Sequence, residues 1–181
     1  MTSVLVACSS RHGFTQGIAE RIAVKLGESG LTAELRSLAS PGDLSGYDAF
    51  VLGSSVYMGS WLRPATEFLR TNRELLAGRP VWLFSSGPLG TSATDAKGRD
   101  LLITSEPKQY AEFRTGLSPR DLKVFFGGLD PNRLRSAERL LRSLPAGRQL
   151  MPEGDFRDWE QIDSWAEGIA RELSAVPAAG H

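Results

Sequence analysis

The sequence predicts an α/β protein built on a doubly wound, five-stranded parallel sheet with helices on both faces. Short continuous apolar runs, typical of strands buried on both faces, alternate with stretches whose apolar residues recur every three or four positions, typical of amphipathic helices. Strand, loop and helix repeated in this order indicate βαβ units with parallel strands. The 181 residues suit a single domain, which we expect over residues 1–175, followed by a flexible tail over 176–181.

Each predicted strand is a short run of apolar side chains. Residues 4–7, 49–52 and 81–84 are continuous apolar runs, and residues 124–126 form a shorter one. Residues 31–35 alternate apolar and polar side chains, which also indicates a strand. These five segments supply the strands of the expected sheet.

Four helices are predicted from apolar residues at helical spacing. They cover residues 14–26, 65–76, 134–144 and 159–173. Asp130 followed by Pro131 is typical of a helix start, because aspartate caps free N–H groups and proline is tolerated in the first turn. Residues 91–120 are less regular and predict only a short helix near residues 108–113.

Composition excludes several classes of protein. Cys8 is the only cysteine, which excludes a disulfide framework and a multi-cysteine zinc site within one chain. Lys+Arg and Asp+Glu number 21 each, and a net charge of zero is atypical of nucleic-acid-binding proteins. No apolar run approaches the ~20 residues that span a bilayer. We therefore expect a cytoplasmic protein that holds no metal.

Polar, glycine-containing loops follow three of the predicted strands. They cover Ser9 to Thr15, Gly53 to Gly59 and Ser85 to Gly90. Ligands of open parallel sheets bind beyond the carboxyl ends of the strands, so three such loops together predict a binding site at this edge of the sheet.

The first loop opens a helix, where hydroxyls and free backbone N–H groups can hold a phosphate. Neither the glycine pattern of dinucleotide-binding proteins nor that of P-loop nucleotidases occurs here. A cysteine phosphatase is excluded because Phe14 stands where an arginine is needed, six residues after Cys8. A serine hydrolase is excluded because no G-x-S-x-G elbow is present.

The first loop, Ser9-Ser10-Arg11-His12-Gly13-Phe14-Thr15, resembles the phosphate loop of flavodoxins. Its arginine before x-Gly-x-Thr is similar to the menaquinone-dependent protoporphyrinogen IX dehydrogenase branch of that family. Gly53-Ser54-Ser55 through Gly59 matches the second flavin loop, and Asp158-Trp159-Glu160-Gln161 is similar to the start of the last helix in that branch. The resemblance covers residues 3–90 and 122–173. It implies the strand order 2-1-3-4-5 and non-covalently bound FMN.

The resemblance also assigns the cofactor site by position to residues of the three loops. On the phosphate, it implies hydroxyl contacts from Ser9, Ser10 and Thr15, and backbone N–H groups from Arg11, His12, Gly13 and Phe14. Along one side of the flavin ring, it implies Ser54, Ser55, Val56, Tyr57, Met58 and Gly59, with Tyr57 or Met58 near the face of the ring. At the pyrimidine end, it implies Ser86, Gly87, Pro88 and Gly90.

An arginine-rich stretch follows the fifth strand. Five arginines and one glutamate give residues 133–148 a local charge of +4; the arginines are Arg133, Arg135, Arg139, Arg142 and Arg148. One interpretation is a solvated helix face. The other is a surface for an anionic partner, either the carboxylates of a substrate or an anionic membrane surface on the cytoplasmic side.

Charge near the flavin bears on function. Electron-carrier flavodoxins are acidic, whereas this chain has zero net charge and its second and third loops contain no Asp or Glu. This favours an FMN-dependent oxidoreductase that passes substrate hydrogen to a quinone-type acceptor, and the resemblance implies protoporphyrinogen IX oxidation in haem biosynthesis. An electron-transfer protein that binds a redox partner and a deazaflavin-binding or scaffolding relative remain alternatives. No side chain is predicted as a catalytic acid or base.

Overall fold

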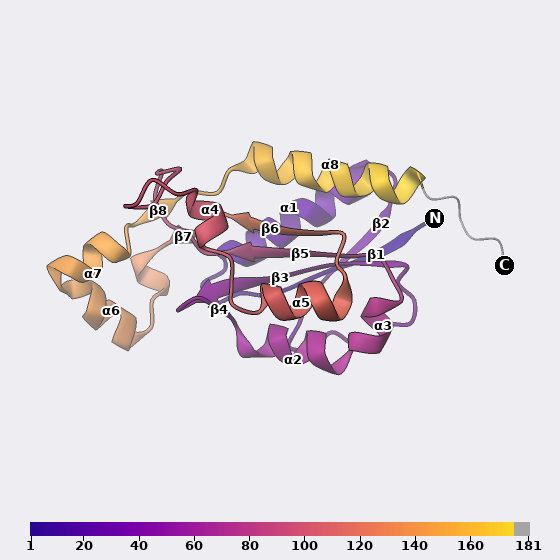
Figure 1. The fold of residues 1–181 in the computed structure, drawn as a ribbon, viewed down its shortest axis with the longest axis horizontal. Coiled ribbons are helices and arrows are strands. Elements are labelled where there is room, and N and C mark those ends of the chain that lie inside the picture. Colours follow the sequence, from indigo (N-terminus) through magenta and orange to yellow (C-terminus); the bar gives the residue numbers. More distant parts are fainter. Residues whose placement is uncertain (176–181) are drawn as a thin grey trace.

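The computed structural model describes residues 1–175, and the predicted tail over 176–181 lies outside the described residues. A twisted parallel sheet lies between two layers of helices (Figure 1). Its strands are β1 (Ser3–Ser9), β2 (Thr32–Ser37), β3 (Ala49–Tyr57), β5 (Val81–Ser86) and β6 (Asp121–Phe125). Their order, β2-β1-β3-β5-β6, is the order 2-1-3-4-5 expected for five strands. A further short strand, β4 (Ser60–Trp61), pairs antiparallel with the end of β3.

One face of the sheet is covered by α1 (Phe14–Glu28) and α8 (Trp159–Ala175), the helices closest to the two ends of the chain. Val4 and Val6 of β1 point to this face and pack against Ile18 and Ile22 of α1. These side chains are fully buried, which is why the apolar spacing of this helix could be recognised in the sequence.

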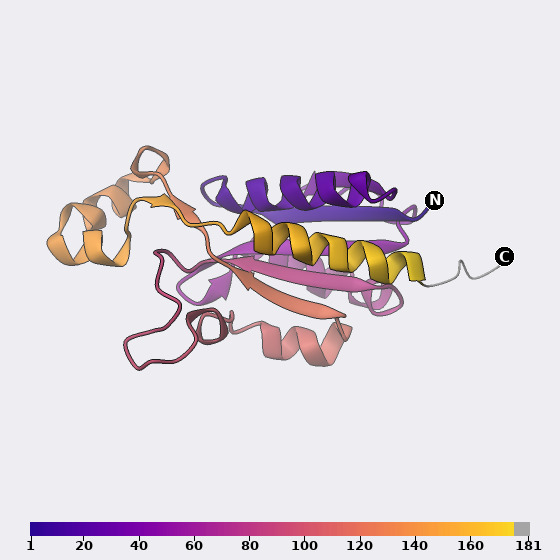
Figure 2. The same ribbon diagram turned by 90° about the horizontal axis from the view of Figure 1, so that it is seen from above.

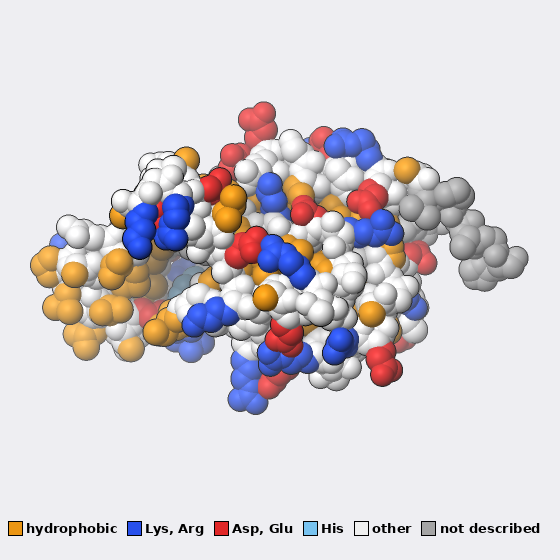
Figure 3. Space-filling view, in the orientation of Figure 1, with side chains coloured by type: hydrophobic (Ala, Val, Ile, Leu, Met, Phe, Trp, Pro, Cys, Tyr) orange, Lys and Arg blue, Asp and Glu red, His pale blue; other side chains and the backbone are white. Residues whose placement is uncertain are grey.

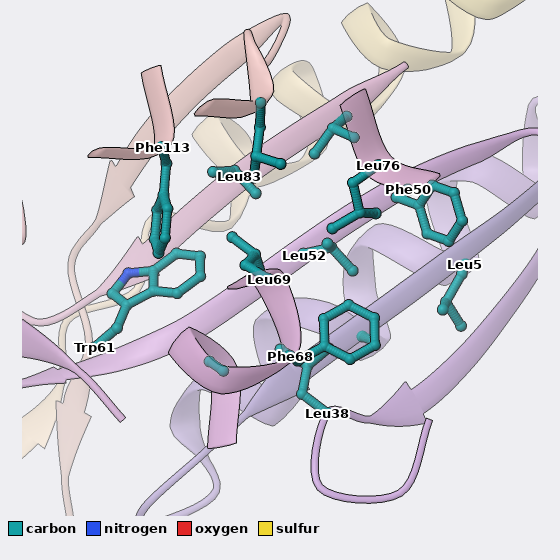
Figure 4. Close-up of a cluster of buried hydrophobic side chains, with 14 of the residues drawn as sticks. Leu5, Leu38, Phe50, Leu52, Trp61, Phe68, Leu69, Leu76, Leu83 and Phe113 are labelled. Carbon is teal, nitrogen blue, oxygen red and sulfur yellow. The ribbon is translucent and has the colours of Figure 1, made fainter. Parts of the chain in front are cut away.

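The other face is covered by α2 (Arg63–Thr71), α3 (Arg73–Ala77) and α5 (Tyr110–Leu117). Leu5 of β1 and Leu52 of β3 point to this side and share a cluster with Phe68 and Leu69 (Figure 4). Successive strand residues point to opposite faces, so a strand between two helical layers is apolar at every position. This explains the continuous apolar runs of the sequence.

Two predicted elements have different bounds in the structure. The helix predicted over residues 65–76 is divided into α2 and α3 at Asn72, whose side-chain amide donates to the Phe68 carbonyl at 2.9 Å. Such side-chain bonds compete with the helical backbone bonds. Residues 91–120 contain α5 and also α4 (Leu101–Thr104), which Asp100 caps through the Leu102 and Ile103 N–H groups.

The helix predicted over residues 134–144 is present but shorter, and it does not continue from Pro131. The chain forms a 3₁₀ turn over Pro131–Arg133, then α6 (Ser136–Ser143) and α7 (Pro145–Leu150). Leu134 is extended, which separates the 3₁₀ turn from α6. Leu144 is also extended, because the residue before a proline is disfavoured in the helical region. We call residues 131–151 the helical projection.

The helical projection extends beyond one end of the sheet (Figure 2). A two-stranded ladder closes its base, formed by β7 (Gly128–Leu129) and β8 (Gly154–Asp155). It therefore lies past the carboxyl ends of the parallel strands, where the three polar loops also end. No helix among residues 1–175 is long and apolar enough to cross a membrane.

Candidate functional site

A cavity of about 180 Å³ lies at the carboxyl ends of β1, β3 and β5. All three predicted loops contribute to its wall. The predicted residues that line it are Arg11, His12, Phe14, Thr15, Ser55, Val56, Tyr57, Ser86 and Gly87. The parallel register of the strands brings these segments together, because Cys8 pairs with Gly53, which in turn pairs with Phe84.

Other predicted residues lie near the cavity without lining it: Ser9, Ser10, Gly13, Ser54, Met58, Gly59, Pro88 and Gly90. Met58 stands in the turn between β3 and β4 with φ +51°, and 83% of it is exposed. Tyr57 therefore remains as the aromatic side chain of the second loop in the cavity wall. The Ser54 hydroxyl accepts from the Leu62 N–H at 3.0 Å, which gives it a structural role in the following turn.

Part of the wall comes from residues that were not among the predicted site residues, although Leu89 lies within the predicted third loop. They are Leu89, Gly127, Gly128, Leu129, Leu134, Glu138 and Met151. The Gly127-Gly128 pair follows the fifth strand. Gly53 and Gly87 stand at similar places in the second and third loops, so the same glycine signal could have identified this pair. Glu138 and Met151 belong to the helical projection, and no local pattern places them at the site.

The start of α1 leaves backbone donors open toward a ligand. Gly13 precedes the helix with φ +89°, a conformation that favours glycine, and no side chain caps this end of the helix. The first N–H groups of a helix have no intrahelical partner. The Ser9 hydroxyl, just before this turn, is buried and has no hydrogen-bond partner among the described residues. A group with acceptor oxygens, such as a phosphate, would bind both the free N–H groups at the start of α1 and the Ser9 hydroxyl.

Ser55 joins the first loop to the second. Its hydroxyl accepts from the Arg11 N–H at 3.2 Å and lies 2.7 Å from the Thr15 hydroxyl. The Gly13 N–H donates to the Ser10 hydroxyl at 3.0 Å. The first loop thus takes its shape from the hydroxyls of its own Ser10 and Thr15 and of Ser55 in the second loop.

A buried carboxylate holds the helical projection against the first loop. Glu138 is only 6% exposed, and its carboxylate accepts from Arg11 Nε at 2.7 Å and from the Arg135 N–H at 2.9 Å. His12 Nε2 lies 3.3 Å from the same carboxylate, and the Arg11 guanidinium carbon lies 4.0 Å from the centre of the Tyr57 ring. Burial by itself raises the pKa of Glu138, but the Arg135 N–H, His12 and Arg11 together lower the pKa below its ordinary value.

Replacing Glu138 by glutamine is expected to destabilise the protein by about 1–3 kcal/mol at pH 7, because Arg11 loses its charged partner in a partly buried position. A carboxylate with a lowered folded-state pKa stabilises the fold above its unfolded pKa of about 4.3, and this stabilisation is lost as the pH falls through the folded pKa. In urea unfolding, the free energies of unfolding of the unmodified protein and of Glu138→Gln should therefore converge at acidic pH. Glu167→Gln, at an exposed carboxylate, serves as the control, and a difference that persists undiminished at low pH would contradict the assignment.

Cys8 takes no part in this arrangement. Burial raises the pKa of its thiol to about 12, with a smaller contribution from Glu20, so the thiol stays protonated. Cys8 is therefore a buried strand residue that does not act as a thiolate nucleophile.

Residues 5–144 match the family model described as a flavodoxin domain. The chain belongs to this family. Over 179 residues it is 25% identical to protoporphyrinogen IX dehydrogenase (quinone) of Escherichia coli strain K12, covering 92% of this chain and 93% of that protein. The same identity and coverage hold for the protein of that name from Escherichia coli O157:H7.

Solved structures share the flavodoxin fold. A flavodoxin from the domain Archaea superposes with a TM-score of 0.57 at 16% identity, covering 96% of this chain and 99% of that one. The rubredoxin:oxygen oxidoreductase of Desulfovibrio gigas gives 0.61 at 19% identity, over 97% of this chain but only 37% of that one. A cysteine-to-serine variant of a flavodoxin from Pseudomonas aeruginosa gives 0.58 at 17% identity, over 96% and 100% of the two chains.

The cofactor of this flavodoxin-family protein is FMN. The observed residues fit such a group, since an uncapped helix start and the unpartnered Ser9 hydroxyl within the described chain suit a phosphate. The neutral wall formed by Val56, Tyr57 and Leu89 suits a flat aromatic ring. The protein is therefore a flavodoxin-like flavoprotein with an oxidoreductase or electron-transfer role.

Proposed function

We propose that the protein is an FMN-dependent oxidoreductase that passes hydrogen from a small-molecule substrate to a quinone-type acceptor. The observation that carries the proposal is the charge of the cavity wall. Among the described residues its single carboxylate, Glu138, is paired with Arg11, and the wall segments from the second and third loops are neutral. Uncompensated carboxylates beside the ring would oppose the negative charge that two-electron reduction adds to the cofactor.

Bound FMN supplies the hydride and electron chemistry, and the protein supplies binding and electrostatics. In this proposal the Ser9, Ser10 and Thr15 hydroxyls hold the phosphate, together with backbone N–H groups at the start of α1. Tyr57 lines one side of the ring, and Ser86 and Gly87 border its pyrimidine end. No side chain of the cavity is assigned as a catalytic acid or base.

Protoporphyrinogen IX, an intermediate of haem biosynthesis, is the proposed substrate. The support is the 25% identity to the Escherichia coli dehydrogenase of that name over nearly the whole length of both chains. The test is to mix the FMN-loaded protein with protoporphyrinogen IX without oxygen and follow the visible absorbance of the flavin. We expect rapid bleaching, and recovery on addition of menaquinone. Reduction by a protein donor alone would instead favour an electron-transfer module.

The relatives also include flavodoxins, so an electron-transfer protein is the second candidate function. A deazaflavin-binding or scaffolding role is a third alternative. The absorbance spectrum of the purified protein, with mass analysis of the released cofactor, separates the third alternative from the first two.

Adding a carboxylate beside the flavin should lower its reduction potential. Ser86 is 5% exposed and lines the cavity, so Ser86→Asp places a charge close to the ring. We expect the reduction potential for the second electron to fall by ~60 mV or more, which is the equivalent of ~1.4 kcal/mol of repulsion. Spectroelectrochemical titration measures the shift, with Ser86→Asn as the uncharged control. A very low potential in the unmodified protein would favour the electron-carrier alternative.

We also propose that the helical projection contacts an anionic membrane, where a lipid-soluble quinone would be met. Leu140, Leu144 and Leu150 are 73%, 56% and 77% exposed, and hydrophobic side chains gather over this end of the molecule (Figure 3). Arg139 lies on α6 and Arg135 directly precedes this helix, and both side chains are exposed. Apolar side chains beside arginines are typical of helices that lie in a membrane interface.

Some of the five arginines predicted to form a basic surface are bound within the protein. Arg142 is only partly exposed, since it donates to the Met151 carbonyl at 3.1 Å and contacts Glu153 at 3.3 Å. Arg133 donates to the His12 carbonyl in the first loop. Arg139 is exposed but also donates to a backbone carbonyl, that of Asn132, at 2.7 Å. Arg135 and Arg148 are therefore the arginines best placed to meet an anionic surface.

A further inference from the structure

Two arginines from the far end of the sequence bind the backbone of the first loop. Arg133 Nη1 donates to the His12 carbonyl at 3.0 Å, and Arg157 Nη1 donates to the Phe14 carbonyl at 3.2 Å. The Phe14 ring lies near both guanidinium groups, with its centre 5.9 Å from Arg133 and 5.0 Å from Arg157. Residues 133 and 157 flank the α6–α7 segment, so both of its ends are attached to the start of α1.

Glycines leave room for these contacts. A Cβ atom at Gly13 would lie 2.6 Å from Arg133 Nη1, and a Cβ atom at Gly17 would lie 2.4 Å from Arg157 Nη1. Gly13 also needs its positive φ, but Gly17 is an ordinary helical residue for which the space is the specific requirement. The first turn of α1 therefore accepts a guanidinium group at each of these two glycines.

The N–H of the Phe14 peptide unit is that of Thr15, which lies at the open helix start. The N–H of the His12 unit is that of Gly13, which donates to the hydroxyl of Ser10, one of the proposed phosphate contacts. A carbonyl that accepts from a cation polarises its own peptide unit, and the N–H of that unit becomes a stronger donor. A phosphate at this helix start would therefore be bound more tightly with both guanidinium groups in place than without them.

The two arginines differ in how far their charge is compensated. Arg157 forms a two-point pair with Asp155, at 2.8 and 2.6 Å, and its side chain is only 14% exposed. Arg133 lies 3.6 Å from Asp130 and its side chain is 58% exposed, so solvent and salt screen its charge. Arg157 is thus the firmer of the two contacts, and the contribution of Arg133 should fade with salt.

We propose that Arg133 and Arg157 are positioning residues for the phosphate of the cofactor, acting through the His12 and Phe14 peptide groups. This rests on the proposed phosphate site in the first loop. It assigns the α6–α7 segment a second role, since occupancy of the phosphate site stabilises the attachment of both ends of that segment. FMN binding and the attachment of the α6–α7 segment are coupled, and such coupling is reciprocal. The factor by which the attached arginines raise the affinity for FMN is therefore also the factor by which bound FMN favours the attachment.

The decisive variant is Gly17→Ala, which displaces the end of Arg157 while keeping the arginine and improving the helix propensity of α1. We expect Gly17→Ala and Arg157→Ala to weaken FMN binding about tenfold, and Arg133→Ala to weaken it by a smaller, salt-dependent factor. Riboflavin, which lacks the phosphate, should bind all three variants as it binds the unmodified protein. Arg171→Ala, at an exposed arginine on α8, is the matched control.

Titrations of each apoprotein with FMN and with riboflavin, followed by flavin fluorescence, measure these affinities. Hydrogen exchange of residues 131–157 adds a second measurement, in which FMN should protect this segment more than riboflavin does. FMN affinity unchanged in both Gly17→Ala and Arg157→Ala would overturn the inference, as would equal weakening of FMN and riboflavin. If the unmodified protein binds riboflavin as tightly as FMN, the phosphate site itself is wrong and the inference falls with it.

Discussion

Thr15→Ala is expected to weaken FMN binding by about 1.5–3 kcal/mol, the usual loss when a hydrogen bond to a charged group is removed. The Thr15 hydroxyl is buried at the start of α1 and lies 2.7 Å from the Ser55 hydroxyl, which fixes its position. In the proposed site this hydroxyl binds the phosphate. The affinity for riboflavin should change little, because riboflavin has no phosphate to lose.

Fluorescence titration of the apoprotein with FMN, FAD and riboflavin measures this effect. The unmodified protein should prefer FMN, since no dinucleotide-binding glycine pattern is present to hold the second half of FAD. Thr15→Ser keeps the hydroxyl and serves as the control. Unchanged FMN affinity in Thr15→Ala would remove Thr15 from the site, and equal affinities for FMN and riboflavin would remove the phosphate loop altogether.

Leu140→Glu combined with Leu144→Glu should abolish the binding of anionic lipid vesicles, if the helical projection lies in a membrane interface. Each leucine buried in the interface contributes ~1.5–3 kcal/mol, so losing two lowers the affinity by a factor of roughly 100 or more. Both side chains are exposed, so the fold should tolerate the change. Sedimentation with vesicles that contain anionic lipid measures the binding.

Val24→Glu with Leu35→Glu is the matched control, because these exposed apolar side chains lie elsewhere on the molecule. Arg135→Glu with Arg139→Glu should remove a smaller, salt-sensitive part of the binding, since each arginine contributes ~1 kcal/mol near an anionic surface. Full vesicle binding by the double-leucine variant would contradict the membrane proposal. Lost substrate turnover with intact vesicle binding in the arginine variant would indicate that the arginines serve the carboxylates of the substrate.

The sheet could be predicted because its signals are local. Residues 4–7, 49–52 and 81–84 are apolar at every position, and the structure shows why, since neighbouring side chains enter opposite helical layers. The three polar loops were predicted to meet for an equally general reason, because parallel strands end at one edge. Thr15, Ser55 and Gly87 of these loops do line one cavity.

The helical projection could not be predicted in the same way. The sequence spacing placed Leu134, Leu141 and Leu144 on one apolar stripe. Leu134 is buried, but Leu141 and Leu144 are exposed, and the charged Glu138 is buried in their place. Pro145 ends α6 by holding Leu144 extended and then begins α7, and the extended Leu134 separates α6 from the 3₁₀ turn before it.

The sequence by itself determined the order of strands and helices and the loops that carry polar groups, because these depend on neighbouring residues along the chain. Only the tertiary structure decided which charges reach the first loop. Glu138 is buried because it meets Arg11, 127 residues earlier in the chain, and Arg157 reaches the Phe14 carbonyl across a separation of 143 residues. Burying a charge is favourable only where a partner compensates it, and that partner is supplied by the fold rather than by the local sequence.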